Sequence, residues 1–267
     1  MANTQYNSFW HATAPTFVAA SGEPQGHYDV AIIGAGFTGL GAARKLAKKG
    51  MGVAVLEAQS VGFGASGRNG GHLNNGLAHS FVEACASFGQ ETAIAMYRAF
   101  DDGIETIERI ADEEKIECNF RRSGKLKLAS KPKHMIEIRK NFDALNALVD
   151  PETTLLTRDE LSEEIGSSAF HGAMLQPRSA MMHMGRFATG LAEAASRHGA
   201  SIFEASPVIQ CVPDAKGCRL TTPAGTITAQ KVLLATGAYT TPNFHWFRRR
   251  IIPVGSFLIA TRPLTDD

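Results

Sequence analysis

The sequence predicts an α/β fold built on a parallel sheet. An apolar run of strand length at residues 28–33 is followed by the Ala- and Leu-rich pattern of a helix, and then by a second apolar run at 52–56. A glycine-rich turn joins the first run to the helix. Strand, helix and strand in this order are typical of a βαβ unit, whose strands are parallel and buried. We therefore expect a Rossmann-like sheet.

The following elements are expected in chain order. The first helix covers residues 37–49, because Lys48 and Lys49 followed by Gly50 are stop signals. A glycine-rich loop covers 59–76. Helical patterns follow at 81–115, with a break near Gly89, at 133–148, after the capping-box pair Thr157 and Glu160, and at 185–198. Strands are expected at 125–130, 169–175, 179–183, 201–205, 231–235 and 251–260, and a hairpin pairs 219–222 with 226–228.

Composition excludes several classes of protein. The 267 residues carry 27 Lys and Arg against 26 Asp and Glu, a net charge of +1, which does not favour nucleic acid. No apolar run reaches the roughly 18 residues of a membrane span. The four cysteines form no CxxC pair and no zinc spacing, so we expect reduced thiols, no metal and a cytoplasmic protein.

The glycine-rich turn has the GxGxxG spacing of a dinucleotide-binding site. Gly34 permits the tight turn, Gly36 lets the backbone approach a pyrophosphate, and Gly39 allows the helix to pack closely on the strand. The helix N-terminus then offers N–H groups and a partial positive charge to phosphates.

An acidic residue follows at the expected distance. Glu57 ends the second strand, where a carboxylate accepts hydrogen bonds from both ribose hydroxyls of an adenosine and repels a 2′-phosphate. This favours FAD or NAD over NADP.

The loop after the second strand separates FAD from NAD. Residues 62–72 read GFGASGRNGGH, a polar glycine-rich segment that a nicotinamide domain does not need. A flavin dinucleotide extends further from the first βαβ unit, so small residues there let the backbone pass close to it. A flexible surface loop is the alternative interpretation. Further on, the run 231–235 ends in Thr236 and Gly237, a small-residue turn at the end of the sheet, where ligands bind in open α/β folds.

These motifs resemble the D-amino-acid-oxidase-like FAD-dependent oxidoreductases. The resemblance is carried by YDVAIIGAGFTGLGAARKLAKKG, by VAVLEAQSVGFGASGRNGGH and by KVLLATGAYT. The Ser-Phe-Trp run at residues 8–10 and the ASGRNGG loop are most similar to the γ-glutamylputrescine oxidoreductases of that family. The resemblance implies FAD contacts by Gly34, Gly36, Phe37, Thr38, Gly39, Glu57, Ala58, Ser66, Arg68, Asn69, Gly70, Gly71, Val208, Thr236 and Gly237. Val208 is expected in a strand after Pro207, with its backbone on the adenine.

The resemblance also implies a domain organisation. After an irregular lead-in of residues 1–27, the FAD-binding domain takes residues 28–80 and 185–240. It is interleaved with an α+β substrate domain from residues 81–184 and 241–267. Members of the family continue for longer, so we expect that substrate domain to be incomplete here, with the missing half possible on another chain.

The implied reaction is oxidation of a C–N bond in a small-molecule amine or amino acid, by hydride transfer to flavin. A γ-glutamylputrescine-like substrate, and with it polyamine catabolism, is favoured. His72, beside the glycine-rich loop, is the candidate for a catalytic group near the flavin. Two alternatives stay open: a non-catalytic, truncated FAD- or nucleotide-binding fragment and, less favoured because of loop 62–71, an NAD-dependent dehydrogenase.

Overall fold

The computed structural model describes residues 8–20, 22–215 and 217–261, which divide into two compact units. The first unit contains residues up to Gly70, Ile116–Cys118 and the chain from His183 onward. The second contains Gly71–Lys115 and Asn119–Met182. No described helix is long and apolar enough to cross a membrane. The assignment of these segments to FAD-binding and substrate domains stays a prediction.

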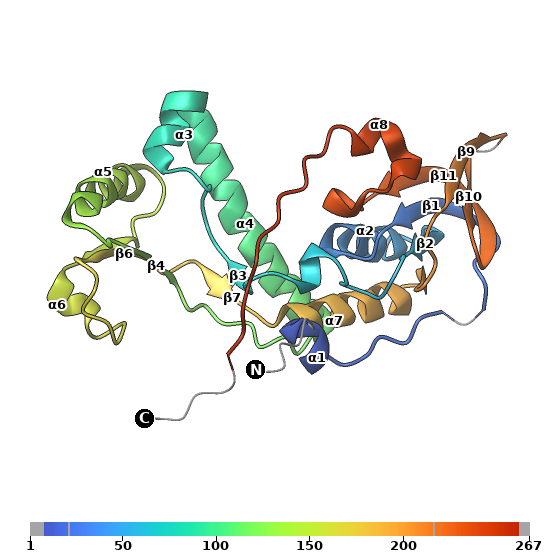
Figure 1. Ribbon diagram of the computed structural model, residues 1–267, viewed down its shortest axis with the longest axis horizontal. Helices are drawn as coiled ribbons and strands as arrows, with labels where there is room; N and C mark the ends of the chain where they lie inside the picture. The colour runs from blue at the N-terminus through green and yellow to red at the C-terminus, as the bar shows by residue number, and fades with distance from the viewer. Residues whose placement is uncertain (1–7, 21, 216, 262–267) are drawn as a thin grey trace, which may run out of the picture. The chain divides into compact units, whose positions relative to one another are not determined.

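The first unit is built on a six-stranded sheet in the order β8-β2-β1-β11-β10-β9 (Figure 1). Its strands are β1 His27–Ile33, β2 Val53–Leu56, β8 Ser201–Phe203, β9 Gln210–Asp214, β10 Gly217–Thr222 and β11 Gly225–Leu234. β8, β2, β1 and β11 are parallel, while β10 is antiparallel to both of its neighbours. The predicted α/β class with a parallel βαβ sheet is confirmed.

The helices of the first unit are α1 Phe9–Thr13, α2 Phe37–Ala47, α7 Met184–Arg197 and α8 His245–Arg248, with short 3-10 turns η1 Ala65–Gly67, η2 Gly237–Tyr239 and η3 Pro242–Phe244. α2 and α7 pack on one another, and the rings of Phe37 and Phe187 are 5.6 Å apart. Ala31 and Ile33 of β1 belong to a buried cluster with Leu56 and Phe203. Burial of apolar side chains from neighbouring strands thereby fixes the register of the sheet.

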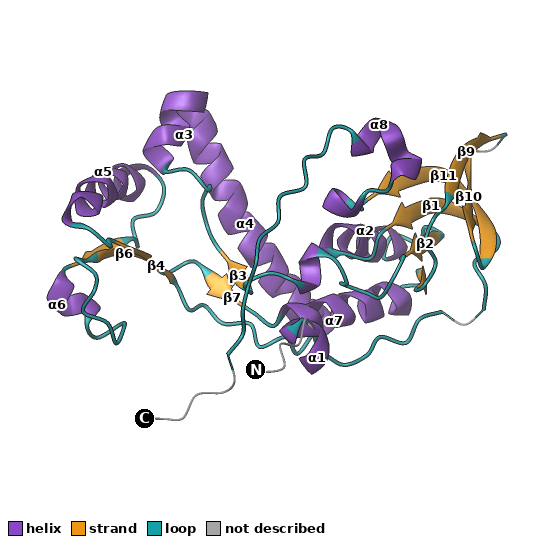
Figure 2. Cartoon of the chain, viewed as in Figure 1, coloured by secondary structure: helices purple, strands orange, loops and turns teal. Residues whose placement is uncertain are grey.

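The second unit combines helices with two small sheets (Figure 2). Its helices are α3 Phe81–Phe88, α4 Gln90–Glu114, α5 Pro132–Leu148 and α6 Arg158–Leu161. One sheet pairs β3 His72–Leu73 with β7 Ala180–Met181, and the other has the order β4-β6-β5, from Lys125–Leu128, Ala173–Gln176 and Thr154–Leu156. Its core includes Phe81, Tyr97, Ile138, Leu145 and Met174.

Local signals place several boundaries of this unit correctly. Gly89 separates α3 from α4 at a φ of +83°, which a glycine adopts without strain. The capping box of Thr157 and Glu160 opens α6 with both of its hydrogen bonds formed. The predicted break in the long helix and the predicted short helix are therefore confirmed.

Three strand predictions are wrong or incomplete. Residues 251–260 form no strand, and Ile252, Phe257 and Ile259 are 87%, 94% and 95% exposed. Apolar composition does not make a strand when no neighbouring strand hydrogen-bonds to it, and Pro253 lacks a donor. The hairpin strand and the run 231–235 are one continuous strand, β11, that pairs first with β10 and then with β1. The strand expected after Pro207 begins only at Gln210, as β9.

Candidate functional site

The turn after β1 can be built only from glycine at two positions. Gly34 has a φ of +104°, and a Cβ there would lie 2.9 Å from the Ala235 carbonyl oxygen at the end of β11. A Cβ on Gly39 would overlap the Gly34 carbonyl oxygen and lie 3.2 Å from the Ile32 side chain. The first turn of α2 is thereby held directly against β1.

The N-terminus of α2 faces the glycine-rich loop. Its N-cap residue, Gly36, brings no capping side chain, and the N–H of Phe37 donates to Ser66 Oγ at 3.0 Å. A Cβ on Gly36 would lie 3.0 Å from the same oxygen. The first-turn N–H groups lack intrahelical acceptors, and the helix dipole adds partial positive charge. This end of α2 is therefore suited to an anion such as a phosphate.

Glu57 follows β2 and is fixed by backbone donors. Its Oε2 accepts the N–H of Ala35 at 2.7 Å, and its Oε1 accepts the N–H of Gln59 at 2.9 Å. A carboxylate has about four acceptor positions, so each oxygen keeps one for a further donor. The side chain is half-buried beside the glycine turn. It is therefore oriented to accept hydroxyl groups.

The loop of residues 59–70 is braced by its own polar side chains. Asn69 Nδ2 donates to the carbonyl oxygens of Ala65 and Ser66 at 3.0 and 2.9 Å. Arg68 Nε donates to the Phe63 carbonyl oxygen at 2.8 Å, and its guanidinium lies 4.6 Å from the centre of the Phe63 ring. These contacts hold the turn around η1 in one shape.

Helix α1 clamps the same loop, which sequence reasoning missed. Ser8 Oγ donates to the Gly67 carbonyl oxygen, and Trp10 Nε1 donates to the Asn69 carbonyl oxygen at 2.7 Å. His11 Nε2 lies 3.0 Å from the Gly62 carbonyl oxygen. Residues 9–13 are thus helical within a segment expected to be irregular. The only signal was Ser8, a preferred N-cap residue, before three aromatic rings.

The end of β11 supplies a third turn. Thr236 Oγ1 and Thr240 Oγ1 are 2.6 Å apart, and Gly237 has a φ of +50°. A Cβ on Gly64 would lie 3.0 Å from the Tyr239 ring, which sequence reasoning also missed. The carboxyl ends of β1, β2 and β11, with the loop 59–70, therefore meet at one edge of the sheet, the usual ligand edge of open α/β folds.

The structure places most of the predicted cofactor residues in the first unit. They are Gly34, Gly36, Phe37, Thr38, Gly39, Glu57, Ala58, Ser66, Arg68, Asn69, Gly70, Val208, Thr236 and Gly237. Gly71 and His72 belong to the second unit, where His72 is exposed and pairs with Met181 between β3 and β7. The catalytic role of His72 and the cofactor contacts stay predictions.

Val208 is buried but does not lie in a strand, which corrects the expectation. Ala205 has a φ of +48°, and the Ser206 N–H donates to the Glu57 carbonyl oxygen at 2.7 Å. The chain therefore turns beside Glu57 before pairing resumes, with the N–H of Ile209 on Thr221. Val208 packs into the apolar cluster under this turn.

Comparison with known proteins gives a consistent result. Residues 29–267 match the family described as DAO, FAD dependent oxidoreductase. The chain is 36% identical over 252 residues to Probable oxidoreductase OrdL of Haemophilus influenzae, covering 90% of this chain and 57% of that protein. It is 31% identical over 240 residues to Gamma-glutamylputrescine oxidoreductase of Escherichia coli, covering 90% and 56%. The chain therefore spans little more than half the length of these relatives.

Solved structures share the fold. Glycine oxidase from Geobacillus kaustophilus matches with a TM-score of 0.65 and 27% identity, over 80% of this chain and 56% of that chain. L-amino acid deaminase from Proteus myxofaciens matches with a TM-score of 0.71 and 20% identity, over 85% and 49%. The second likeness concerns the fold alone.

Proposed function

The chain belongs to the DAO family of FAD-dependent oxidoreductases, and we propose that it forms the part of an amine or amino-acid oxidase that holds the ADP half of FAD. One observation carries this proposal: the first turn of α2, beginning after Gly36, lies beside the Glu57 carboxylate at the carboxyl edge of the sheet. The phosphate and ribose groups of an adenine dinucleotide need these two features next to one another.

The residues present fit the cofactor. Gly36 carries no side chain at the N-terminus of α2, so its backbone can approach a pyrophosphate closely. Glu57 would accept the ribose hydroxyls through the acceptor positions that Ala35 and Gln59 leave open. Val208 would lie against the adenine. When bound, FAD supplies the acceptor for a hydride from the carbon of a C–N bond.

The substrate class that we propose is a small amine or amino acid. The likeness to Gamma-glutamylputrescine oxidoreductase of Escherichia coli supports a γ-glutamylated polyamine, whereas the likeness to glycine oxidase supports a simpler amine. Anaerobic addition of γ-glutamylputrescine or glycine to the FAD-loaded protein separates these substrates. Loss of the visible absorbance of the oxidised flavin identifies the compound that is oxidised.

FAD binding is tested directly on the purified chain. Titration with FAD should quench flavin fluorescence in a saturable way, and NADH should not compete. Gly36→Asp places a negative side chain against the pyrophosphate and should abolish binding. Gly41→Ala is the matched control, because Gly41 lies on the same helix and a Cβ there meets nothing within 4 Å. Equal FAD affinity in both variants would remove the basis of the proposal.

A second candidate function is nucleotide binding without turnover. The predicted ADP contacts all lie in the first unit, while the proposed catalytic side chain, His72, belongs to the second. FAD binding without bleaching by any amine would favour this function. Bleaching that appears only with a second polypeptide would support the proposed missing half on another chain.

A cytoplasmic location is part of the proposal. The four cysteines are free thiols, and Cys211 and Cys218 form no disulfide although they lie on the adjacent strands β9 and β10. Free thiols are typical of reducing compartments.

A further inference from the structure

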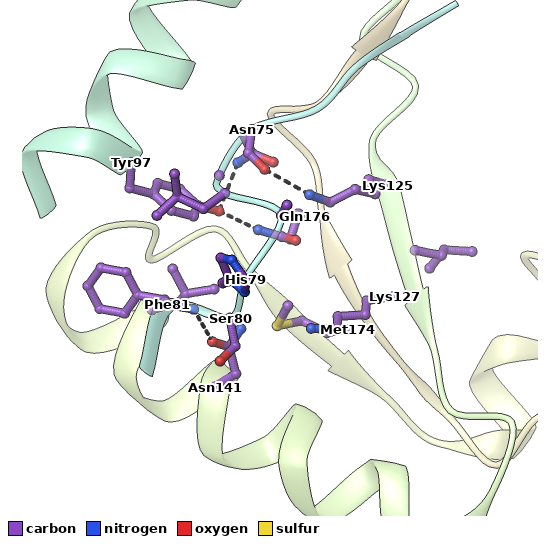
Figure 3. Close-up of a pocket in the computed structure, with 15 residues that line it drawn as sticks. Asn75, His79, Ser80, Phe81, Tyr97, Lys125, Lys127, Asn141, Met174 and Gln176 are labelled. Atoms are coloured by element: carbon purple, nitrogen blue, oxygen red, sulfur yellow. Dashed lines mark hydrogen bonds between the residues drawn. The ribbon is translucent and has the colours of Figure 1, made fainter. Parts of the chain in front are cut away.

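A cavity of about 230 Å³ lies within the second unit, and none of the residues proposed to hold FAD lines it (Figure 3). It is bounded by the loop of residues 75–81, by α4 and by one face of the β4–β6 pair. Lys125 pairs with Gln176 and Lys127 with Met174, so these four side chains share that face of the sheet. The cavity is smaller than typical pockets for drug-sized ligands, so its occupant must be small.

The polar wall of the cavity presents hydrogen-bond donors. Lys125 Nζ donates to the Asn75 carbonyl oxygen at 2.8 Å, which uses one of its three N–H groups. Asn141 is 5% exposed, and its Oδ1 accepts the N–H of Phe81 at 2.7 Å. In the described part of the chain, no hydrogen bond uses the Nδ2 group of Asn141. The Tyr97 hydroxyl accepts from both Asn75 and Gln176, so its own proton is left to donate.

The charge in this wall is positive. Lys125 and Lys127 line the cavity, and none of the described residues that line it is acidic. Burial, and then the like charge of Lys127, lowers the pKa of Lys125, while the charges of Asp101 and Asp150 raise it. Lys125 has no ion pair among the described residues. The effect of burial on Lys125 outweighs that of these two carboxylates, so its ammonium group is costly to keep charged, and an anion in direct contact with it would offset more of that cost.

The nearest carboxylates in the core do not face this space. Asp150 Oδ2 accepts from Asn75 Nδ2 at 3.3 Å, whereas Lys125 Nζ donates to the backbone carbonyl oxygen of Asn75. Arg178 lies 3.5 Å from both Asp101 and Asp150 and balances part of their charge. Glu83 is held at the start of α3 by Ser80. Asp101, Asp150 and Glu83 therefore offset part of the charge of the two lysines, but none of these carboxylates lines the cavity.

The remaining wall is apolar. Leu77, Phe81, Leu145 and Met174 line the cavity, and Leu145 and Met174 are each 1% exposed. An inorganic anion would satisfy the donors but leave this wall against water. A ligand with one anionic end and a short alkyl chain matches both walls.

We propose that this cavity binds a short-chain monocarboxylate, with the carboxylate on Lys125 and the alkyl chain against Leu145 and Met174. The site lies within the second unit and does not depend on FAD. Its occupancy is therefore a property separate from the proposed function.

The test is calorimetric titration of the purified chain with sodium butyrate. We expect saturable binding with one site, and no binding of the uncharged isostere butyramide. Lys125→Met should weaken butyrate binding at least tenfold, because it removes the buried charge and keeps the side-chain length. Lys133→Met, an exposed lysine on α5 outside the cavity, should bind as the unchanged chain does.

Other outcomes would overturn the proposal. Equal binding of butyramide would show that the charge plays no part, and tighter binding of inorganic phosphate than of butyrate would exclude a carboxylate site. Circular dichroism checks that Lys125→Met is folded. If it is not folded, Lys127→Met, whose side chain is exposed at the rim, replaces it with an expected loss of threefold or more. Unchanged affinity in that variant would also reject the site.

Discussion

The indole N–H of Trp10 donates to the carbonyl oxygen of Asn69 at 2.7 Å, and so ties the N-terminal helix α1 to the glycine-rich loop. Asn69 in turn holds Ala65 and Ser66 through its side chain, and Ser66 accepts the first N–H of α2. A chain of contacts therefore runs from Trp10 to the helix end proposed to bind the pyrophosphate. Such supporting contacts pre-organise a binding loop and reduce the entropy lost on binding.

Trp10→Phe should weaken FAD binding without unfolding the chain. The substitution keeps an aromatic ring but removes one hydrogen bond, worth about 0.5–1.5 kcal/mol. The FAD dissociation constant should therefore rise about 2–10-fold in a fluorescence titration. Trp246→Phe is the control, since Trp246 is 56% exposed on α8 and should leave the affinity unchanged. A Trp10→Phe variant that binds FAD as tightly as the Trp246 variant would show that the clamp is not needed.

Sequence reasoning located the elements whose signals are local. The turn from Gly34 to Gly39 and the capping box of Thr157 each depend on residues within a few positions, and both formed as expected. The glycine spacing also reports a tertiary contact, because Gly39 packs against Gly34 and Ile32. The edge of the sheet that we propose to bind the nucleotide could therefore be predicted from one short motif and the acidic residue that follows it.

The features that sequence reasoning missed or misplaced depend on contacts between segments that are distant in the sequence. Ser8 and Trp10 each reach residues 59 positions away, and no periodicity in residues 1–27 signals this. His72 is adjacent in sequence to the glycine-rich loop but belongs to the second unit, so proximity along the chain did not determine its place. Strand formation at 251–260 failed for the same reason, since β-propensity is expressed only against a neighbouring strand.

Gly39→Ala should destabilise the first unit strongly. The new Cβ would overlap the Gly34 carbonyl oxygen, a backbone atom that cannot move without shifting the turn. Overpacking of this kind costs about 1–3 kcal/mol. Gly41→Ala, two residues along the same helix, meets nothing and should stabilise by up to about 1 kcal/mol through helix propensity. Urea unfolding of both variants measures the difference, and equal midpoints would contradict the close packing at Gly39.

Glu57→Gln should reduce both FAD affinity and stability. An amide nitrogen cannot accept the N–H of Ala35 or Gln59, so one of these two donors loses its partner. A hydrogen bond that the charged Glu57 carboxylate accepts from the ribose would contribute about 1.5–3 kcal/mol. Its loss would therefore weaken FAD binding about 10–100-fold. Glu23→Gln, at an exposed position of the same unit, controls for the change in charge.

If FMN, which lacks the adenosine, bound with the same affinity to both variants, the loss would be specific to the ribose contact. An equal loss for FMN would instead contradict a direct role of Glu57 in holding the ribose.

Asp101→Asn should alter how stability depends on pH. Burial raises the pKa of the Asp101 carboxyl, and the charge of Asp150 adds to this, while Arg178 opposes it. The native state therefore holds this proton to a higher pH than the unfolded chain, whose Asp pKa is about 3.9. The stabilisation from the protonated form is complete below that value and is lost as the pH rises through the raised native pKa.

Since the introduced amide is neutral at every pH, the stability of the variant relative to the unchanged chain should increase with pH across this window. Asp102→Asn, at the exposed neighbouring position on α4, controls for the loss of a carboxylate. Urea unfolding between about pH 3.5 and pH 7 measures both, and a relative stability of Asp101→Asn that stays flat or falls as the pH rises would show that Asp101 is not held in its protonated form by burial.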